Sequence, residues 1–268
     1  MNPPDEDYAT PVRLAIYLEI GWSDFLFDAP KGKANDNGMP YPNPLRDVVS
    51  PQFPRAVAAL ARSWAEGIAL DAQNICDVGG ATGRTVFELE RQFPESERLV
   101  LVEPSKRFCE WALRLLSSDC PLPEFPIVDR VDAPRWVSAR SRPPPLARAA
   151  ERLTVVNETL EGYRPSQGFD LITCLNVVDR HPCPSALVNS IGRLMNDGGL
   201  LVLSCPFDFD EISTPDPEAW LDDLNVLFAG SSDWTHVGED EVCYEFRSHN
   251  RSWTRFSAQL VGKRWRGK

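Results

Sequence analysis

Apolar and polar positions alternate along the chain between two kinds of segment. Short, nearly continuous apolar runs predict strands, and they lie at residues 74–80, 98–105, 152–158, 169–178 and 198–207. Between them, apolar residues recur at the three- and four-residue spacing of a helix, as in TVFELERQF, KRFCEWALRLL and PSALVNSIGRLM. Strands that alternate with helices predict a doubly wound α/β fold, in which a mostly parallel sheet is covered by helices on both faces.

The end of the chain has a different pattern. The stretch CYEFRSHNRSWTRFSAQLVGKRW, residues 243–265, predicts two strands joined by a turn at HNRS. Because strands that are consecutive and tightly connected pair antiparallel, we expect an antiparallel edge at the C-terminal side of the sheet.

Proline indicates where the regular elements are interrupted. The 24 prolines concentrate in residues 1–54, in the RSRPPPLAR stretch and near residue 215, and we expect loops or ordered coil there. A chain of 268 residues is long enough for one sizeable core. We therefore expect a single domain at residues 70–268 with an insertion at about 130–150. An N-terminal extension of helices and loops, residues 1–69, precedes it as a candidate lid.

Charge narrows the classes of function. The formal net charge is −11, which opposes general nucleic-acid binding, because affinity for phosphate backbones comes from clustered Lys and Arg. Basic residues cluster only near the C-terminus, at Arg247, Arg251, Arg255, Lys263, Arg264, Arg266 and Lys268. A solvated last strand and tail explains this cluster at least as well as an anion site does. We expect no nucleic-acid partner.

Other sequence signals bear on location and metal chemistry. No apolar run approaches the roughly 20 residues that a membrane helix needs, and the start MNPPDEDYAT lacks the basic-then-apolar layout of a secretion signal. We expect a cytoplasmic location and no membrane partner. The seven cysteines include no close CxxC pair, so we expect reduced core thiols and no metal site.

The first two predicted strands both end in residues suited to ligand binding. In an open α/β sheet, ligands bind beyond the carboxyl ends of the strands. The first strand leads into Asp77-Val78-Gly79-Gly80-Ala81-Thr82-Gly83, where glycines permit a tight turn and a close backbone approach. The second ends in Glu103, an acidic side chain able to accept both hydroxyls of a ribose. Taken separately, the loop is equally consistent with a plain strand-to-helix turn, and Glu103 with a solvated strand end.

Together and in this order, these residues resemble motifs I and II of the class I S-adenosylmethionine-dependent methyltransferases. The usual pattern is Asp/Glu-x-Gly-x-Gly-x-Gly, followed by an acidic residue at the end of strand two. Ala81 stands here where the pattern has its middle glycine. The resemblance spans roughly residues 70–207 and implies a Rossmann-like sheet of seven strands, with S-adenosyl-L-methionine as cofactor and S-adenosyl-L-homocysteine as product.

The resemblance also implies roles for individual residues. The loop glycines would let the methionyl part of the cofactor approach the backbone, namely Gly79, Gly80 and Gly83. Asp77 would organise the loop and Glu103 would hold the ribose. Asn157 or Glu158, just past the third strand, would meet the adenine.

The stretch CLNVVDRHPCP carries Asn176 and Asp179 out of the fourth predicted strand. It resembles the corresponding part of protein-histidine N-pros-methyltransferases, in which Asn-x-x-Asp-Arg follows the same strand. The stretch PYPNPLRDVVSPQFPRAVAAL is more loosely similar to the methyltransferase domain of ovothiol synthases, whereas EVCYEFRSHNRSW lacks much of the ovothiol pattern. Both relatives act on imidazole, so the resemblance implies N-methylation of histidine, a histidine derivative or a peptide histidine.

The chemistry of imidazole fits these two side chains. A neutral imidazole has one N–H and one lone pair, and the nitrogen without the proton is free to attack. Asp179 would accept the N–H and stabilise the imidazolium that forms, while Asn176 would orient the ring. Alternatively, Asn176 binds only the cofactor or closes a turn, and Asp179 caps the helix beginning near Pro182 or pairs with Arg180.

Five further residues are weaker candidates for contacts to the acceptor. His181 is either a general base or an ordinary loop histidine. Tyr41 and Arg55 belong either to a lid over the cofactor or to the packing of the extension against the sheet. Tyr244 and Phe246 form either an aromatic wall of the acceptor pocket or part of the core.

Two other functions stay open. The acceptor is an imidazole in the leading hypothesis, but an O-, N- or S-methyltransferase acting on another small natural product has the same motifs. A cofactor-binding but inactive partner subunit is the third hypothesis. The pattern leaves open the oligomeric state, and whether the acceptor is a free small molecule or a peptide.

Overall fold

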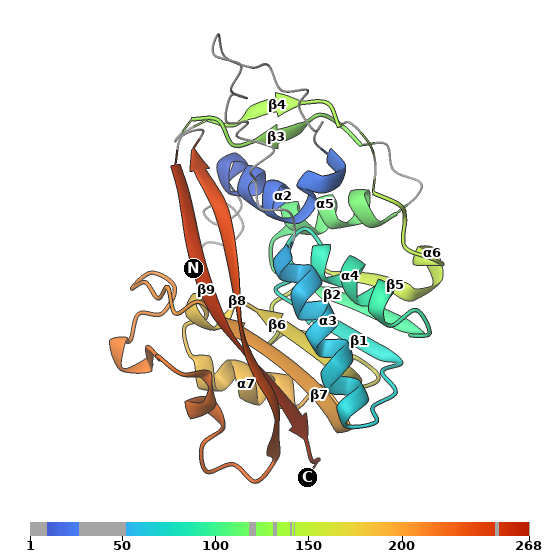
Figure 1. Ribbon diagram of the computed structural model, residues 1–268, viewed down its shortest axis with the longest axis vertical. Coiled ribbons are helices and arrows are strands. Elements are labelled where there is room, and N and C mark those ends of the chain that lie inside the picture. The colour runs from blue at the N-terminus through green and yellow to red at the C-terminus, as the bar shows by residue number, and fades with distance from the viewer. Residues whose placement is uncertain are drawn as a thin grey trace, which may run out of the picture.

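A computed structural model describes residues 10–26, 52–117, 122–130, 133–139, 141, 143–249 and 252–267 of the chain. Within these ranges the centre is a seven-stranded sheet in the order β5-β2-β1-β6-β7-β9-β8 (Figure 1). In that order the strands are Leu153–Val156, Arg98–Val102, Asn74–Val78, Phe169–Leu175, Met195–Cys205, Ser252–Trp265 and Trp234–His249. The first five run parallel, and β9 and β8 are antiparallel. This confirms the predicted doubly wound sheet with an antiparallel C-terminal edge.

Side chains of the central strands alternate between two apolar cores, one on each face of the sheet. Ile75 of β1 packs into one core and its neighbour Cys76 into the other. The first core is covered by α2 (Pro11–Leu26), α3 (Gln52–Gly67), α4 (Arg84–Gln92) and α5 (Lys106–Leu116). The second is covered by α7 (Pro184–Gly192) with the 3-10 helices η1 (Val178–Arg180) and η3 (Leu224–Phe228). Burial on both faces explains why the strands are nearly continuous apolar runs.

Helix α2 corrects the prediction that residues 1–54 are loops or coil. It begins at Pro11, a position where proline is tolerated because the first N–H groups of a helix have no partner within the helix. Leu14, Leu18, Trp22 and Leu26 are buried at a spacing of four residues, which places one face of α2 against the core. Residues 27–51 lie outside the described ranges.

A separate small sheet overlaps the predicted insertion at about 130–150 and begins just before it. Its strands β3 (Phe125–Ile127) and β4 (Arg135–Val137) pair antiparallel, and the short α6 (Ala149–Arg152) follows them. The 3-10 helix η2 (Pro217–Ala219) lies between β7 and β8. None of the helices in the described ranges is both long and apolar enough to cross a membrane.

The β8–β9 hairpin is longer than predicted, because β8 begins at Trp234 rather than near residue 243. Acidic residues and Gly238 interrupt the alternation in this stretch, which hides the strand from a pattern analysis. Gly238 has a structural reason: a Cβ there would lie 2.6 Å from Cε2 of Trp64, so the indole of α3 requires bare backbone.

The hairpin also extends beyond the parallel part of the sheet. β7 ends at Cys205, which pairs with Gln259, so the β9 residues before Gln259 pair with β8 alone. In Figure 1 the hairpin rises past the central strands to the level of α2 and the β3–β4 sheet. The hairpin therefore lies beside the edge of the sheet at which the parallel strands end.

A buried ion pair connects the β8–β9 hairpin to α2. Arg247 of β8 donates to Glu19 of α2 from Nε at 3.0 Å and from Nη2 at 2.5 Å. The backbone N–H of Val128 donates to Glu19, and the Val128 carbonyl accepts from Arg247. Both charged side chains are almost fully buried, so charge pairing and hydrogen bonds compensate their desolvation. In the sequence, Arg247 was noted only as part of the basic C-terminal cluster, and Glu19 carried no signal.

Candidate functional site

The loop after β1 takes a shape that only small residues permit. Gly79 has φ of +69°, and a Cβ there would lie 2.5 Å from Cγ2 of Val177. A Cβ on Gly80 would lie under 3.0 Å from the Asp77 carboxylate. Ala81 also has positive φ, at +45°, and Gly83 at +83° is the N-cap of α4. The loop therefore exposes backbone at the start of a helix, as close approach of a ligand requires.

Asp77 has a buried carboxylate, and only one of its two oxygens accepts a hydrogen bond within the described residues. Its Oδ1 accepts a hydrogen bond from the Thr173 hydroxyl of β6 at 2.7 Å. Its Oδ2 has no hydrogen-bond partner among the described residues. Burial raises the pKa of Asp77 to about 7; the Thr173 hydrogen bond opposes that rise, and the negative charge of Glu103 adds to it. A cation bound beside the loop would favour the ionised form.

Glu103, just past β2, ties the loop to the second strand. Its Oε2 accepts from the backbone N–H of Ala81 at 3.0 Å, and its Oε1 from that of Ser105 at 2.9 Å. A carboxylate oxygen has about two acceptor positions, so it can accept from a backbone N–H and from a second donor. The structure thus joins the two predicted motifs through a direct contact.

The two residues predicted to meet an adenine differ in placement. Asn157, just past β5, donates from Nδ2 to the carbonyls of Glu103 at 3.2 Å and Pro104 at 2.8 Å. Glu158 instead lies over the turn at Gly162, where a Cβ would be 2.5 Å from its Oε1. Asn157 is therefore attached to the Glu103 turn, and Glu158 is directed toward the following turn.

Asn176 leaves β6 with an unusual backbone conformation and a fixed side chain. Its φ is +55°, in the left-handed region that asparagine tolerates better than most residues. Its N–H donates to the Ser204 carbonyl at 3.0 Å, and the Ser204 hydroxyl donates to its Oδ1 at 2.8 Å. Within the described ranges, the side-chain nitrogen makes no hydrogen bond. The amide is thus oriented by β7, with its N–H₂ group left for a ligand.

Asp179 lies in η1 and is 1% exposed. Its Oδ2 accepts from the backbone N–H of Asp208 at 3.1 Å, while its Oδ1 has no partner in the part of the chain described. Burial raises the pKa of Asp179, and the positive charge of Arg180 opposes that rise. The N-cap of α7 is Cys183, so Asp179 does not cap that helix. A buried oxygen without a partner requires an explanation, and a ligand is one.

Arg180 forms shorter ion pairs with the loop that follows β7 than with Asp179. Its Nη2 lies 2.6 Å from Oδ2 of Asp208 but 3.9 Å from Oδ2 of Asp179. Its Nη1 lies 3.0 Å from Oδ2 of Asp210. The pairing of Asp179 with Arg180 is therefore the weaker of these contacts.

Both ring nitrogens of His181 are occupied. Nε2 lies 2.9 Å from Oε1 of Glu161, and Nδ1 lies 3.0 Å from the backbone nitrogen of Cys183. This geometry is that of a loop histidine that orders its own turn, and it leaves no ring nitrogen free to serve as a base.

The two hairpin aromatics are stacked side by side with a third ring. Phe256 of β9 stacks on Tyr244 at 5.3 Å and on Phe246 at 5.6 Å between ring centroids. Phe53 of α3 packs against Tyr244 at 5.0 Å. Burial raises the pKa of the Tyr244 phenol, and the negative charge of Asp179 raises it further. Tyr244 therefore belongs partly to the core and partly to the surroundings of Asp179.

Arg55 joins a cluster that holds α2, α3 and α4 together. Its Nη2 lies 2.6 Å from Asp24 and its Nε 3.3 Å from Glu88. The buried Arg84 pairs with the same two acids, at 2.8 Å and 2.5 Å. The observed contacts of Arg55 are those of packing. Tyr41 lies outside the described residues.

Sequence reasoning missed several partners of the site residues. Thr173 and Ser204 orient Asp77 and Asn176, and each interrupts an apolar stretch of its strand, LITCL in β6 and LLVLSC in β7. Such an isolated polar position is a usable signal, because a buried hydroxyl needs a partner. The contact of Asp208 with Asp179 had no such signal in the sequence. It depends on how the loop after β7 packs against the end of β6.

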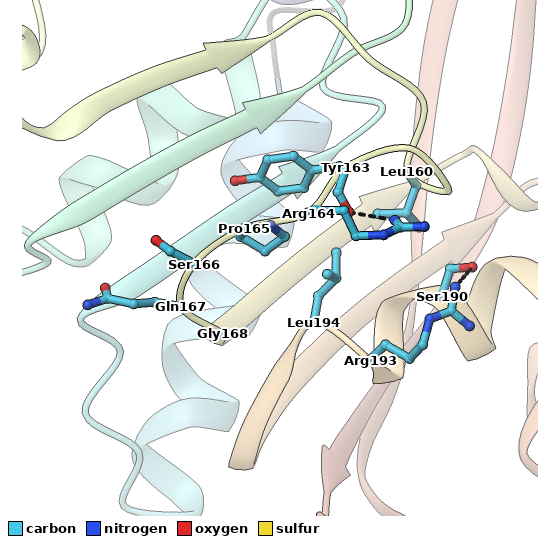
Figure 2. A pocket seen from close by; sticks show the side chains of 10 residues that line it. All are labelled: Leu160, Tyr163, Arg164, Pro165, Ser166, Gln167, Gly168, Ser190, Arg193 and Leu194. Atoms are coloured by element: carbon cyan, nitrogen blue, oxygen red, sulfur yellow. Dashed lines mark hydrogen bonds between the residues drawn. The ribbon is translucent and has the colours of Figure 1, made fainter.

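A cavity lies at the opposite ends of the strands from these residues. It measures about 470 Å³, and its lining includes Gly168, Leu194, Arg164 and Arg193 (Figure 2). Gly168 and Leu194 directly precede β6 and β7, so this cavity is at the amino ends of the strands. Figure 2 shows Arg193 bonded to Ser190 there, at 2.8 Å. In the described ranges, no group of three or more His, Cys, Asp or Glu side chains is arranged to hold a metal ion.

Comparison with known proteins yields a family model described as a methyltransferase domain, which matches residues 45–251. No curated protein matches the sequence. The N-methyltransferase NodS from Bradyrhizobium japonicum, solved in complex with S-adenosyl-L-homocysteine, is 15% identical, with 87% of this chain and 93% of that chain covered and a TM-score of 0.50. Magnesium protoporphyrin IX methyltransferase from Synechocystis, with the methyl donor bound, is 12% identical, with coverages of 88% and 86% and a TM-score of 0.49. At these identities the likeness is one of fold.

Proposed function

The chain belongs to this methyltransferase-domain family, and we propose that it is an S-adenosylmethionine-dependent N-methyltransferase whose acceptor is an imidazole ring. The family supports the reaction class. The acceptor is proposed from the chemistry of the residues that leave β6.

The residues at the ends of β1 and β2 fit the proposed cofactor. When bound, S-adenosylmethionine supplies a methyl group on a positively charged sulfur. The unpartnered Oδ2 of Asp77 provides negative charge beside the loop, and backbone at Gly79 and Gly80 has no space for a Cβ. Glu103, which holds the backbone of Ala81, is the acidic side chain at the end of β2 that would accept the ribose hydroxyls. Asn157 lies next to that turn, where an adenine would follow the ribose.

The unpartnered Oδ1 of Asp179 is the observation that carries the choice of acceptor. A buried carboxylate oxygen is stabilised by an N–H donor, and a neutral imidazole offers one N–H opposite its lone pair. Asp179 accepting that proton would fix the tautomer whose other nitrogen attacks. The imidazolium that forms would be stabilised by the same carboxylate, in a site where burial strengthens the interaction.

Asn176 and the surrounding groups would supply orientation. The Ser204 hydroxyl holds Oδ1 of Asn176, so its N–H₂ group is presented in one direction. Alignment of two reactants contributes roughly 7 to 11 kcal/mol to catalysis when the geometry is good. The Asn-x-x-Asp-Arg resemblance to protein-histidine N-pros-methyltransferases supports the same roles for Asn176 and Asp179.

The test is methyl transfer from labelled S-adenosylmethionine to free histidine, imidazole derivatives and histidine peptides, read by mass spectrometry. Asp179→Asn should lower kcat/KM by about 10² to 10³, because the tautomer is no longer selected. Its affinity for S-adenosylhomocysteine should stay near that of the wild type. Glu97→Gln removes an exposed carboxylate outside this site and is the control that should retain activity.

Other outcomes separate the alternatives. Transfer to a phenol, carboxylate, thiol or other amine but to no imidazole would keep the reaction class and remove the acceptor. Tight cofactor binding with no transfer to any acceptor would favour an inactive partner subunit. Unchanged turnover in Asp179→Asn would remove the role of Asp179.

A further inference from the structure

The negative charge of the protein is concentrated in one continuous segment. Residues 194–246 contain 13 Asp and Glu and no Lys or Arg. The rest of the chain holds 26 acidic and 28 basic residues, so it carries almost no net charge. The net charge of −11 therefore originates entirely in β7, the loop after it and β8.

The loop of this segment is fastened against the end of β6. The N–H of Asp208 binds Asp179, and Arg180 pairs with the carboxylates of Asp208 and Asp210. Further along, the Thr214 hydroxyl donates to the His181 carbonyl at 2.9 Å. In Figure 1 this orange segment lies beside α7, which follows η1 along the chain. The acidic loop is thus the immediate surroundings of Asp179.

Several acids on this loop have no role in folding that the described residues reveal. Glu211, Glu218 and Asp222 are exposed, and no hydrogen bond or ion pair of their carboxylates is found in the described ranges. The two large apolar side chains between them are also exposed, Ile212 by 94% and Trp220 by 39%. Unpaired like charges repel one another, so a cationic partner would relieve this repulsion.

The acidic loop borders a buried carboxylate that has one oxygen without a hydrogen-bond partner in the described ranges. Oδ1 of Asp179 is buried and has no partner in the described ranges, although Oδ2 of the same carboxylate is held by the loop backbone. The acidic surface and the unpartnered oxygen are independent observations that coincide at the end of β6. A surface of one charge sign beside such a group guides an oppositely charged ligand toward it.

We propose that the methyl acceptor is presented by a basic peptide segment, in which Lys or Arg residues flank the acceptor side chain. The flanking cations contact the loop acids, with Ile212 and Trp220 as apolar contacts, while the acceptor reaches Asp179. This inference rests on the proposed methyltransferase function and specifies its substrate class as a cationic polypeptide.

Binding is tested first, without any methyl transfer. Fluorescence anisotropy is measured with a labelled peptide rich in Lys and Arg that contains no histidine, and with acidic and uncharged peptides of equal length. The basic peptide should bind at least about tenfold more tightly than the others, and the difference should shrink as salt is raised through about 0.5 M. Equal binding of the three peptides would overturn the inference.

Charge variants then locate the surface. The triple variant Glu211→Gln, Glu218→Gln, Asp222→Asn should weaken basic-peptide binding by about tenfold. The control Glu95→Gln, Glu97→Gln, Glu110→Gln removes the same charge from exposed positions outside the segment and should bind like the wild type. An equal loss in both triples would assign the effect to net charge and overturn the site.

Transfer assays separate this inference from the proposed function. Peptides with one histidine flanked by Lys and Arg should be methylated with a higher kcat/KM than peptides with Ser or Glu flanks. If basic peptides bind selectively but histidine is not methylated, the result supports the acidic binding surface and contradicts imidazole as the acceptor. If histidine is methylated without any preference for basic flanks, the acceptor stands and the surface fails.

Discussion

The half of the site that fits the cofactor and the half that fits the acceptor are built in different ways. Most of the cofactor half lies in residues 77–105, in which one carboxylate, Glu103, binds the backbone of two nearby turns, while Thr173 and Asn157 join it from β6 and the end of β5. The acceptor half joins Asn176 and Asp179 to Ser204, Asp208 and the long hairpin, which come from distant parts of the chain. One half thus depends mainly on a local motif and the other mainly on tertiary contacts. This difference lets related chains keep one cofactor while their acceptors change.

The largest effect is expected from breaking the ion pair between Arg247 of the hairpin and Glu19 of α2. Arg247→Met leaves Glu19 buried without its partner, which typically costs about 3–5 kcal/mol. We expect a large drop in Tm, measured by calorimetry. The double variant Arg247→Met, Glu19→Gln should recover part of the loss, because no charge is then buried alone. A single variant as stable as the wild type would contradict this role of the pair.

The cofactor half is tested by adding one methyl group to its loop. Gly80→Ala places a Cβ under 3.0 Å from the buried Asp77 carboxylate, so the loop must shift. Affinity for S-adenosylhomocysteine should fall roughly 100-fold, or about 3 kcal/mol, by isothermal titration. Gly67→Ala is the control, since a Cβ there meets nothing within 4 Å. A Gly80 variant that binds normally would show that the loop needs no bare backbone.

A pH series tests the charge of the cofactor half. The pKa of Asp77 in the folded protein is raised to about 7 by burial, so its carboxyl takes up a proton as the pH falls below 7. A positively charged ligand favours the ionised form, and its affinity should therefore fall by up to about tenfold per pH unit below pH 7. In Asp77→Asn the binding of S-adenosylmethionine should be flat over pH 5.5–7. A slope that persists in this variant would assign the titration to another group.

The same raised pKa affects stability in the opposite direction. The folded protein holds the Asp77 proton more tightly than the unfolded chain does. The contribution of Asp77 to stability is therefore present at low pH and is lost as the pH rises from about 4 to about 7. Denaturant unfolding without ligand should show this slope in the wild type and a reduced slope in Asp77→Asn.

The smallest expected effect concerns orientation in the acceptor half. Ser204→Ala removes the hydroxyl that holds Oδ1 of Asn176, a bond worth about 0.5–1.5 kcal/mol. We expect kcat/KM for the acceptor to fall by about three- to tenfold, with cofactor affinity unchanged. Loss of cofactor affinity instead would place Asn176 in the cofactor half.

The two halves also differ in how much of them could be predicted. The glycine loop and Glu103 were identified because strand ends and glycines are local signals, and their contact follows once β1 and β2 pair in parallel. Asn176 and Asp179 were found by type and position, but their partners Ser204 and Asp208 were not. The sequence suggested His181 as a candidate general base. Its contacts to Glu161 and Cys183 depend on how its loop folds, which the sequence did not indicate.

The sequence by itself determined the alternation of strands and helices from β1 to β7, the place of the cofactor loop and the concentration of acidic residues in one segment. These are properties of residue type and short-range spacing. Only the tertiary structure decided that α2 is fastened to the hairpin through Glu19 and Arg247, and that the acidic loop lies against Asp179. Such contacts join residues far apart in the chain, and they are selected by burial and by the need of each buried polar group for a partner.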